Sequence, residues 1–152
     1  MSRIDGEVVI AAPAEHVFDM VADERNEPRY NARIARAEKT SEGPVGRGST
    51  FVAEPKGMGA RGAMTVEVVD YQRPERLATS IRSTYMDVDG TLTFDPVEGG
   101  TRMRWSWDMH LRGPSRVLTP LLWAIGPRWE RRNWVDLKHF MERGGRAESA
   151  QP

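Results

Sequence analysis

The sequence predicts an α+β fold, with an antiparallel sheet, two short helices near the N-terminus and one long helix at the C-terminus. Three observations support this prediction. Apolar and polar residues alternate in several segments between residues 4 and 111, which is the pattern of half-buried strands. Short turn sequences join these segments, as in antiparallel sheets. After residue 115 the apolar residues recur with the period of a helix.

The composition indicates one globular domain. The chain has 152 residues, of which 39% are hydrophobic and 29% are charged, and 22 basic residues balance 22 acidic ones. A net charge of zero gives no reason to expect a nucleic-acid partner. The absence of cysteine excludes disulfides and thiolate metal sites. The first seven residues lack the apolar stretch of a signal peptide. We therefore expect a cytoplasmic protein with one domain over residues 1–145 and a frayed tail over 146–152.

The N-terminal elements are a strand and two short helices. Residues 4–10 alternate, with Ile4, Val8 and Ile10 on one side of a strand. A helix is predicted over residues 14–22, because Pro13 suits a helix start and Glu15 favours the positive end of the helix dipole. A second short helix is expected after residue 28.

The remaining strands follow one another with short connections. They are predicted over residues 49–54, 63–71, 76–82, 87–94 and 103–111. The last strand is the most informative, because alternation places Met103, Trp105, Trp107, Met109 and Leu111 on one face. Such bulky and adaptable side chains either fill a core or line a pocket for an apolar small molecule.

The C-terminal helix is the longest predicted element. Its apolar side contains Leu118, Leu121, Leu122, Ile125, Trp129, Leu137, Phe140 and Met141. Ser115 is a suitable N-cap, and glycines at 144 and 145 are a suitable stop. Pro127 has no N–H for the preceding turn, so we expect a kink there or two separate helices.

This order of elements resembles the START-like superfamily, also called SRPBCC or polyketide cyclase/dehydratase-like. The resembling segments are residues 9–18 with 21–23, 28–31, 46–51 and 133–138. They cover nearly the whole chain but belong to the scaffold. The resemblance implies the helix-grip fold, in which a curved antiparallel sheet of about seven strands wraps around a long C-terminal helix and leaves a cavity between them.

The resemblance also implies a ligand for that cavity: a lipid, a polyketide, an aromatic metabolite or another hydrophobic small molecule. On this sequence the wall and mouth of the cavity would contain Phe51, Met64, Val66, Thr79, Ile81, Leu92, Phe94, Trp105, Trp107, Met109, Leu118, Leu122, Ile125 and Trp129. Tyr30 would lie near the mouth with Phe51. Alternatively, these side chains simply meet and fill the space.

Few polar residues are candidates for chemistry. Polyketide cyclases of this fold orient their substrate with a small number of polar groups, so we consider Tyr30 and Tyr85 as proton donors and Arg82 as a carbonyl or enolate stabiliser. The alternative is that Arg82 is a surface cation and Tyr85 packs at a strand end. Glu130 and Asn133, three residues apart on a helix, could hold a polar group of a ligand. The three histidines are far apart and lack metal-ligand spacing.

Three classes of function follow. The first is a protein that carries or senses a hydrophobic small molecule, and the second is an enzyme of the polyketide cyclase or dehydratase type, favoured if Tyr30, Arg82 or Tyr85 is buried. The third is an interaction protein with a closed cavity, favoured if Trp123 or Trp134 is exposed. We expect a monomer or a homodimer without metal, cofactor or membrane contact.

Overall fold

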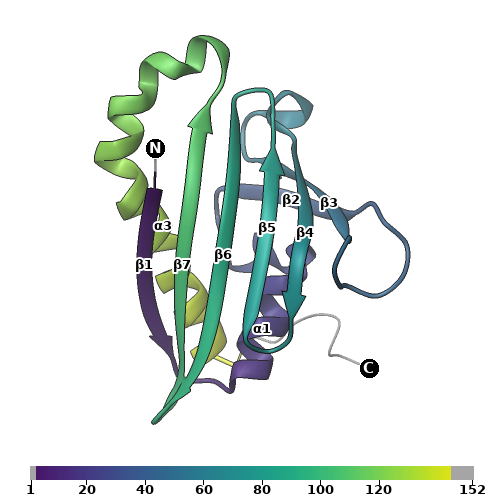
Figure 1. The fold of residues 1–152 in the computed structure, drawn as a ribbon, viewed down its shortest axis with the longest axis vertical. Helices are drawn as coiled ribbons and strands as arrows, with labels where there is room; N and C mark the ends of the chain where they lie inside the picture. Colours follow the sequence, from purple (N-terminus) through teal and green to yellow (C-terminus); the bar gives the residue numbers. More distant parts are fainter. Residues whose placement is uncertain (1–2, 145–152) are drawn as a thin grey trace.

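The computed structural model describes residues 3–144, which form one seven-stranded antiparallel sheet in the order β1-β7-β6-β5-β4-β3-β2 (Figure 1). The strands are β1 (Arg3–Ile10), β2 (Ile34–Lys39), β3 (Thr50–Pro55), β4 (Met64–Gln72), β5 (Arg76–Arg82), β6 (Met86–Val97) and β7 (Gly100–Leu111). The first strand pairs with the last, and each remaining neighbour follows its predecessor in the sequence. Figure 1 shows β2 crossing behind the longer strands, so the sheet curls around its inner face.

The helices gather behind the sheet (Figure 1). They are α1 (Ala14–Ala22), α2 (Glu27–Tyr30) and α3 (Thr119–Glu142), with 3-10 turns η1 (Glu24–Asn26), η2 (Gly59–Gly62) and η3 (Gly113–Leu118). Helix α1 buries Val17, Phe18 and Val21, and the Phe18 ring makes edge-to-face contacts with Phe94 and Tyr71.

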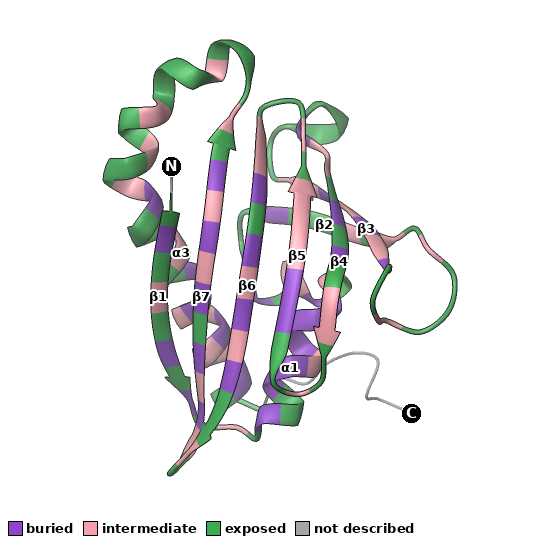
Figure 2. Ribbon diagram, viewed as in Figure 1, coloured by how far each residue is buried: buried purple, intermediate pink, exposed green. Residues whose placement is uncertain are grey.

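The core lies between the inner face of the sheet and these helices. The alternation of buried and exposed residues along the strands is visible in Figure 2. On β7 the inner residues Met103, Trp105, Trp107 and Met109 are all buried. The outer face carries ion pairs instead, such as Arg102 with Glu7.

The C-terminal end of α3 is tied to the corner where β1 leads into α1. Lys138 Nζ donates to the Val9 carbonyl at 2.9 Å and to Glu142 Oε2. The same carboxylate accepts the Ala11 backbone N–H at 2.9 Å. These contacts to Lys138 and Ala11 lower the pKa of Glu142. Together they fix the second half of the helix over β1 and β7.

The predicted α+β architecture is confirmed, with three differences in detail. Strand β2 was not among the segments predicted individually, because only Ile34 in it is buried and its pattern lacks a clear alternation. Ser115 is not the N-cap: residues 113–118 form a 3-10 turn and α3 begins at Thr119. Pro127 lies inside α3, which is one continuous helix, so of the two expectations at this residue the division into two helices is wrong. The predicted tail over 146–152 lies outside the described residues.

Candidate functional site

Two tryptophans of β7 lie across the inner face of the sheet. Gly6 of β1 is the cross-strand partner of Trp105, and Gly90 of β6 is the partner of Trp107. A Cβ atom on Gly6 would lie 2.3 Å from the Trp105 ring, and one on Gly90 would lie 1.5 Å from the Trp107 ring. Both indoles therefore occupy space that only glycine leaves free on the neighbouring strands.

A third tryptophan, Trp134 of α3, covers these two indoles. Its ring is stacked with that of Trp107, at 6.4 Å between centroids and 17° between planes, and lies 6.1 Å from that of Trp105. The Tyr30 ring approaches Trp134 from α2 at 6.4 Å. We call Trp105, Trp107 and Trp134 the indole cluster. All three side chains are buried, at 3%, 7% and 5% exposure, and together they form a large polarisable group.

Glu130 brings a titratable group to the edge of the indole cluster. Trp134 Nε1 donates to Glu130 Oε2 at 3.1 Å, one helical turn away. Burial, reinforced by the charge of Glu27, raises the pKa of Glu130 to about 7, while Arg33 and the indole N–H groups of Trp134 and Trp107 oppose the rise. A carboxyl group with such a pKa can hold or release a proton at neutral pH.

More acidic groups lie beside Tyr30. Burial raises the pKa of Glu24 well above its ordinary value, and repulsion by Glu27 and a hydrogen bond with the Glu27 carboxyl group add to the rise. Burial, together with the charges of Glu27, Glu24 and Glu130, likewise raises the pKa of the Tyr30 phenol. Tyr30 therefore keeps its proton at neutral pH and can act as a hydrogen-bond donor.

Several buried polar atoms around the indole cluster have no protein partner. These are the Nε1 atoms of Trp105 and Trp107 and the Oδ1 atom of Asn133. The Trp107 N–H lies close enough to the Glu130 carboxyl group to lower its pKa, but the contact lacks the geometry of a normal hydrogen bond. Buried polar groups usually find a partner, so these two donors and one acceptor are exceptions among the described residues.

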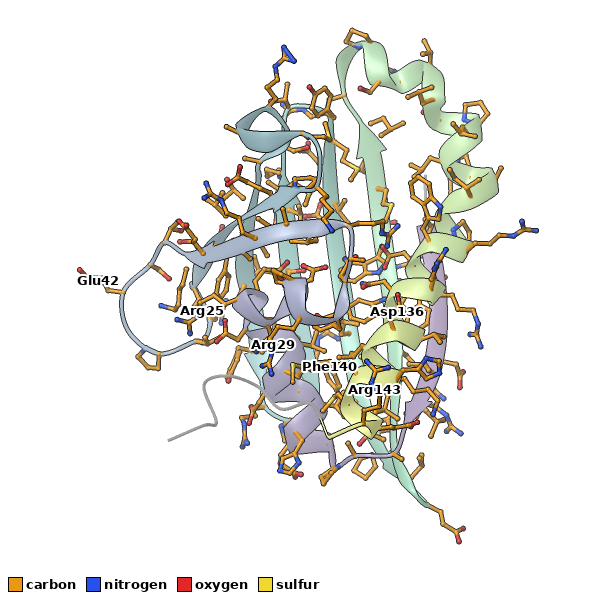
Figure 3. The ribbon with its side chains drawn as sticks, turned by 180° about the vertical axis from the view of Figure 1, so that it is seen from behind. Arg25, Arg29, Glu42, Asp136, Phe140 and Arg143 are labelled. Carbon is orange, nitrogen blue, oxygen red and sulfur yellow. The ribbon has the colours of Figure 1, made fainter. Side chains whose placement is uncertain are left out.

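Arginines from α2 and the following turn flank this region. The guanidinium carbon of Arg33 lies 5.4 Å from the Trp129 ring centroid, and Arg33 Nη2 donates to the Trp129 carbonyl at 3.2 Å. Arg29 lies over the Phe140 ring at 5.1 Å, and Figure 3 shows this pair where α2 meets the end of α3. These contacts link α2 and its following turn to both halves of α3.

A surface depression lies on the outer side of the sheet, where Trp105 is its one residue from the indole cluster. It has a volume of about 430 Å³ and is lined by Asp5, Gly6, Glu7, Thr91, Thr93, Arg104, Trp105 and Ser106. Most of these side chains belong to the outer face of β1, β6 and β7. Its lining combines charged and hydroxyl side chains with Trp105.

The predicted lining residues fall into three groups. Those buried in the core are Phe51, Val66, Leu92, Phe94, Trp105, Trp107 and Met109. Those partly exposed are Met64, Thr79, Ile81, Leu122 and Ile125. Leu118 of η3 and Trp129 of α3, expected to close the cavity, are instead 50% and 51% exposed.

The three polar candidates are far from equivalent. Tyr30 is buried beside Glu130 and Trp134. Its expected neighbour at the cavity mouth, the apolar residue Phe51, is fully buried. Arg82 is exposed and pairs with Asp89 at 3.0 Å, and Tyr85 is 39% exposed at a strand end. Only Tyr30 therefore joins the interior polar groups.

Sequence reasoning did not find the acidic groups beside Tyr30. It considered Glu130 with Asn133 but did not consider Glu24 or Glu27. The available signal was their spacing of three residues, which places both side chains on one side of a helical turn. Trp134, considered as part of an exposed patch, is 5% exposed and belongs to the indole cluster.

Comparison with protein families gives a match over residues 1–136 to the family described as polyketide cyclase / dehydrase and lipid transport. The chain belongs to this family. An uncharacterized protein of Mycobacterium tuberculosis, Rv2574, is 29% identical to it over 123 residues, which are 76% of this chain and 72% of the relative.

Solved structures confirm the START-like fold. A START superfamily protein from Mycobacterium smegmatis matches with a TM-score of 0.77 and 16% identity, covering 94% of this chain and 99% of the other. The protein TTHA0849 from Thermus thermophilus matches with a TM-score of 0.73 and 19% identity, with the same coverage. At these identities the likeness concerns the fold alone. Within residues 3–144, no helix is long and apolar enough to cross a membrane.

Proposed function

We propose that this START-like chain binds a hydrophobic small molecule that carries a polar group, against the indole cluster. The observation that carries the proposal is the meeting of three buried indoles with Glu130, whose pKa is raised to about 7. The indoles offer apolar surface, while Glu130, Tyr30 and the unpaired indole N–H groups offer polar contacts at one end. The family description, which includes lipid transport, agrees with such a ligand.

The proposal is tested with the uncharged dye 6-propionyl-2-dimethylaminonaphthalene, whose ketone oxygen can accept a hydrogen bond from an indole N–H. Dye fluorescence is titrated with the full chain and with Trp107→Phe, which keeps an aromatic ring but removes the indole N–H. We expect binding by the wild type and a loss of about tenfold in the variant, since a lost buried contact costs about 1–2 kcal/mol.

Ser106→Ala is the matched control, because Ser106 neighbours Trp107 on β7 but lies on the outer face. It should bind the dye as the wild type does. Equal losses in both variants, or no binding of the dye by the wild type, would refute the proposed site. Thermal unfolding of each variant shows whether it is folded under the conditions of the titration.

One observation favours a second candidate, an enzyme of the cyclase or dehydratase type. Tyr30 and Glu130 supply a neutral phenol and a carboxyl group with a pKa of about 7 in one region, which suits proton transfer at a carbonyl or enolate. If the chain is an enzyme, Glu130→Gln should retain binding of a poly-β-ketone and lose its conversion. If binding and conversion of the poly-β-ketone fall in proportion, Glu130 contributes to binding only.

A further inference from the structure

Exposed apolar side chains concentrate on η3 and the first half of α3. Val117 is 80% exposed, Leu118 50%, Leu121 52% and Trp123 38%. They lie within seven consecutive residues, where the chain rises past the start of β1, and Figure 2 shows this part largely exposed. We call these four residues the apolar patch. Single exposed apolar residues are common, but a contiguous patch usually marks an interaction site.

The Arg, Lys, Asp and Glu residues within the segment that carries the apolar patch all have the same sign of charge. Residues 109–129 contain Arg112, Arg116 and Arg128 and no Asp or Glu. Arg112 lies 3.6 Å from Asp87. By contrast, Arg116 and Arg128 are exposed and form no ion pair with any residue in the described range 3–144. On an ideal helix Arg128 follows Leu121 by seven residues and lies on the same side.

This combination fits a lipid surface better than a second copy of the chain. A symmetric dimer through the apolar patch would bring the arginines of both copies together, and no acidic residue between positions 109 and 129 would offset their repulsion. An anionic bilayer supplies the opposite charge, and Trp, Leu and Val beside Arg are typical of segments that lie in the interface.

We propose that η3 and the first half of α3 dock on the surface of a bilayer that contains anionic lipids. The apolar patch enters the boundary between headgroups and acyl chains, while Arg116 and Arg128 contact lipid phosphates. The segment lies on the bilayer and does not span it. This proposal differs from the sequence-based expectation of no membrane contact, and it does not depend on the interior ligand site.

The test is cosedimentation of the full chain with large vesicles, either of phosphatidylcholine alone or with about one third phosphatidylglycerol. We expect binding to the anionic vesicles that weakens as salt is added. Replacing Leu118 and Leu121 together by Ser should weaken binding at least tenfold. Arg116→Gln and Arg128→Gln should each weaken it about fivefold at low salt, because each charge near an anionic surface contributes that much.

Matched controls lie elsewhere on the surface. Val69→Ser removes an exposed apolar residue of β4, and Arg47→Gln removes an exposed arginine from a loop; both should bind the vesicles as the wild type does. The proposal is overturned if the wild type ignores anionic vesicles, or if the controls lose as much binding as the patch variants. It is also overturned if the wild type forms a dimer by light scattering, the Ser replacements dissociate that dimer, and the wild type does not bind vesicles.

Discussion

The two halves of α3 have the same helical periodicity but different surroundings. After Glu130, the residues Asn133, Trp134, Leu137 and Met141 are buried, and Lys138 and Glu142 hold backbone groups of the β1–α1 corner. Between Thr119 and Trp129 only Gly126 is buried. The difference teaches that an apolar stripe does not by itself determine burial: the first half of α3 extends past the start of β1, so less of the sheet covers it (Figure 1).

The largest expected effect is a difference in the free energy of unfolding between two variants. One variant removes a buried leucine from the second half of α3, and the other removes an exposed leucine from the first half. Leu137→Ala should lower the free energy of unfolding by about 2–5 kcal/mol, because Leu137 is fully buried. Leu121→Ala should change it by less than about 0.5 kcal/mol. Urea unfolding of both variants measures the difference. Similar losses would show that the two halves are equally packed.

A methyl group beneath the indole cluster should also destabilise the fold. Gly90→Ala places a Cβ atom in the space of the Trp107 ring, which Trp134 holds from the other side. We expect a cost of about 1–3 kcal/mol and a change in the near-ultraviolet circular dichroism of the tryptophans. Gly46→Ala is the matched control, since a Cβ atom there meets no atom within 4 Å. A Gly90→Ala protein as stable as this control would refute the close packing.

Glu130 lies at the boundary between the two halves of α3, and the pH dependence of the free energy of unfolding tests its surroundings. The pKa of Glu130 rises from 4.5 to about 7 on folding. The native state therefore binds this proton more tightly, and the associated stability is present below pH 4.5 and lost as pH rises through 7. Glu130→Gln should remove this loss, which we expect to be on the order of 1–3 kcal/mol.

Urea unfolding at pH 5, 6, 7 and 8 measures this effect. The stability of Glu130→Gln relative to the wild type should increase from pH 5 to pH 7 and level off toward pH 8. Glu38→Gln, on the exposed β2 position, is the control and should give a constant difference. A constant difference for Glu130→Gln as well would show that Glu130 is charged at pH 5 in the folded state.

The smallest effect is expected at the end of α3. Glu142→Gln weakens the contacts with Lys138 and with the Ala11 N–H. Because folding lowers the pKa of Glu142, its stabilisation is present above the ordinary pKa and lost as pH falls. We expect a loss of about 0.5–1 kcal/mol at pH 7, since the contacts are exposed to solvent. The loss should shrink toward pH 3, and a loss that grows on acidification would contradict the contact.

Strong local patterns made most of the fold predictable. The alternation of Met103, Trp105, Trp107 and Met109 correctly indicated one buried face of β7, whereas the pairing of β1 with β7 was not predicted. Strand β2 lacked such a pattern, because its place depends on pairing with β3 and not on its own periodicity. The start of α3 was missed because Gly113 and Pro114 lead into a 3-10 turn before the α-helix.

The candidate site was less predictable than the fold. The indoles of β7 were recognised from alternation, but Trp134 joins them only through the packing of α3. Glu24 and Glu130 have the sequence context of solvated residues, and their pKa values are raised first by burial and then by the approach of Glu27 in space. The contact between α2 and α3 depends on the tertiary structure, and residue spacing within either segment does not predict it.

The most direct test of the interior site is a nuclear magnetic resonance titration with 6-propionyl-2-dimethylaminonaphthalene. It follows the five indole N–H signals, each assigned by replacing one tryptophan with phenylalanine. We predict that the dye shifts the signals of Trp105 and Trp107, whose N–H groups lack protein partners, and leaves those of Trp123 and Trp129 unchanged. Shifts confined to Trp123 and Trp129 would place the ligand on the exposed half of α3 and contradict the interior site.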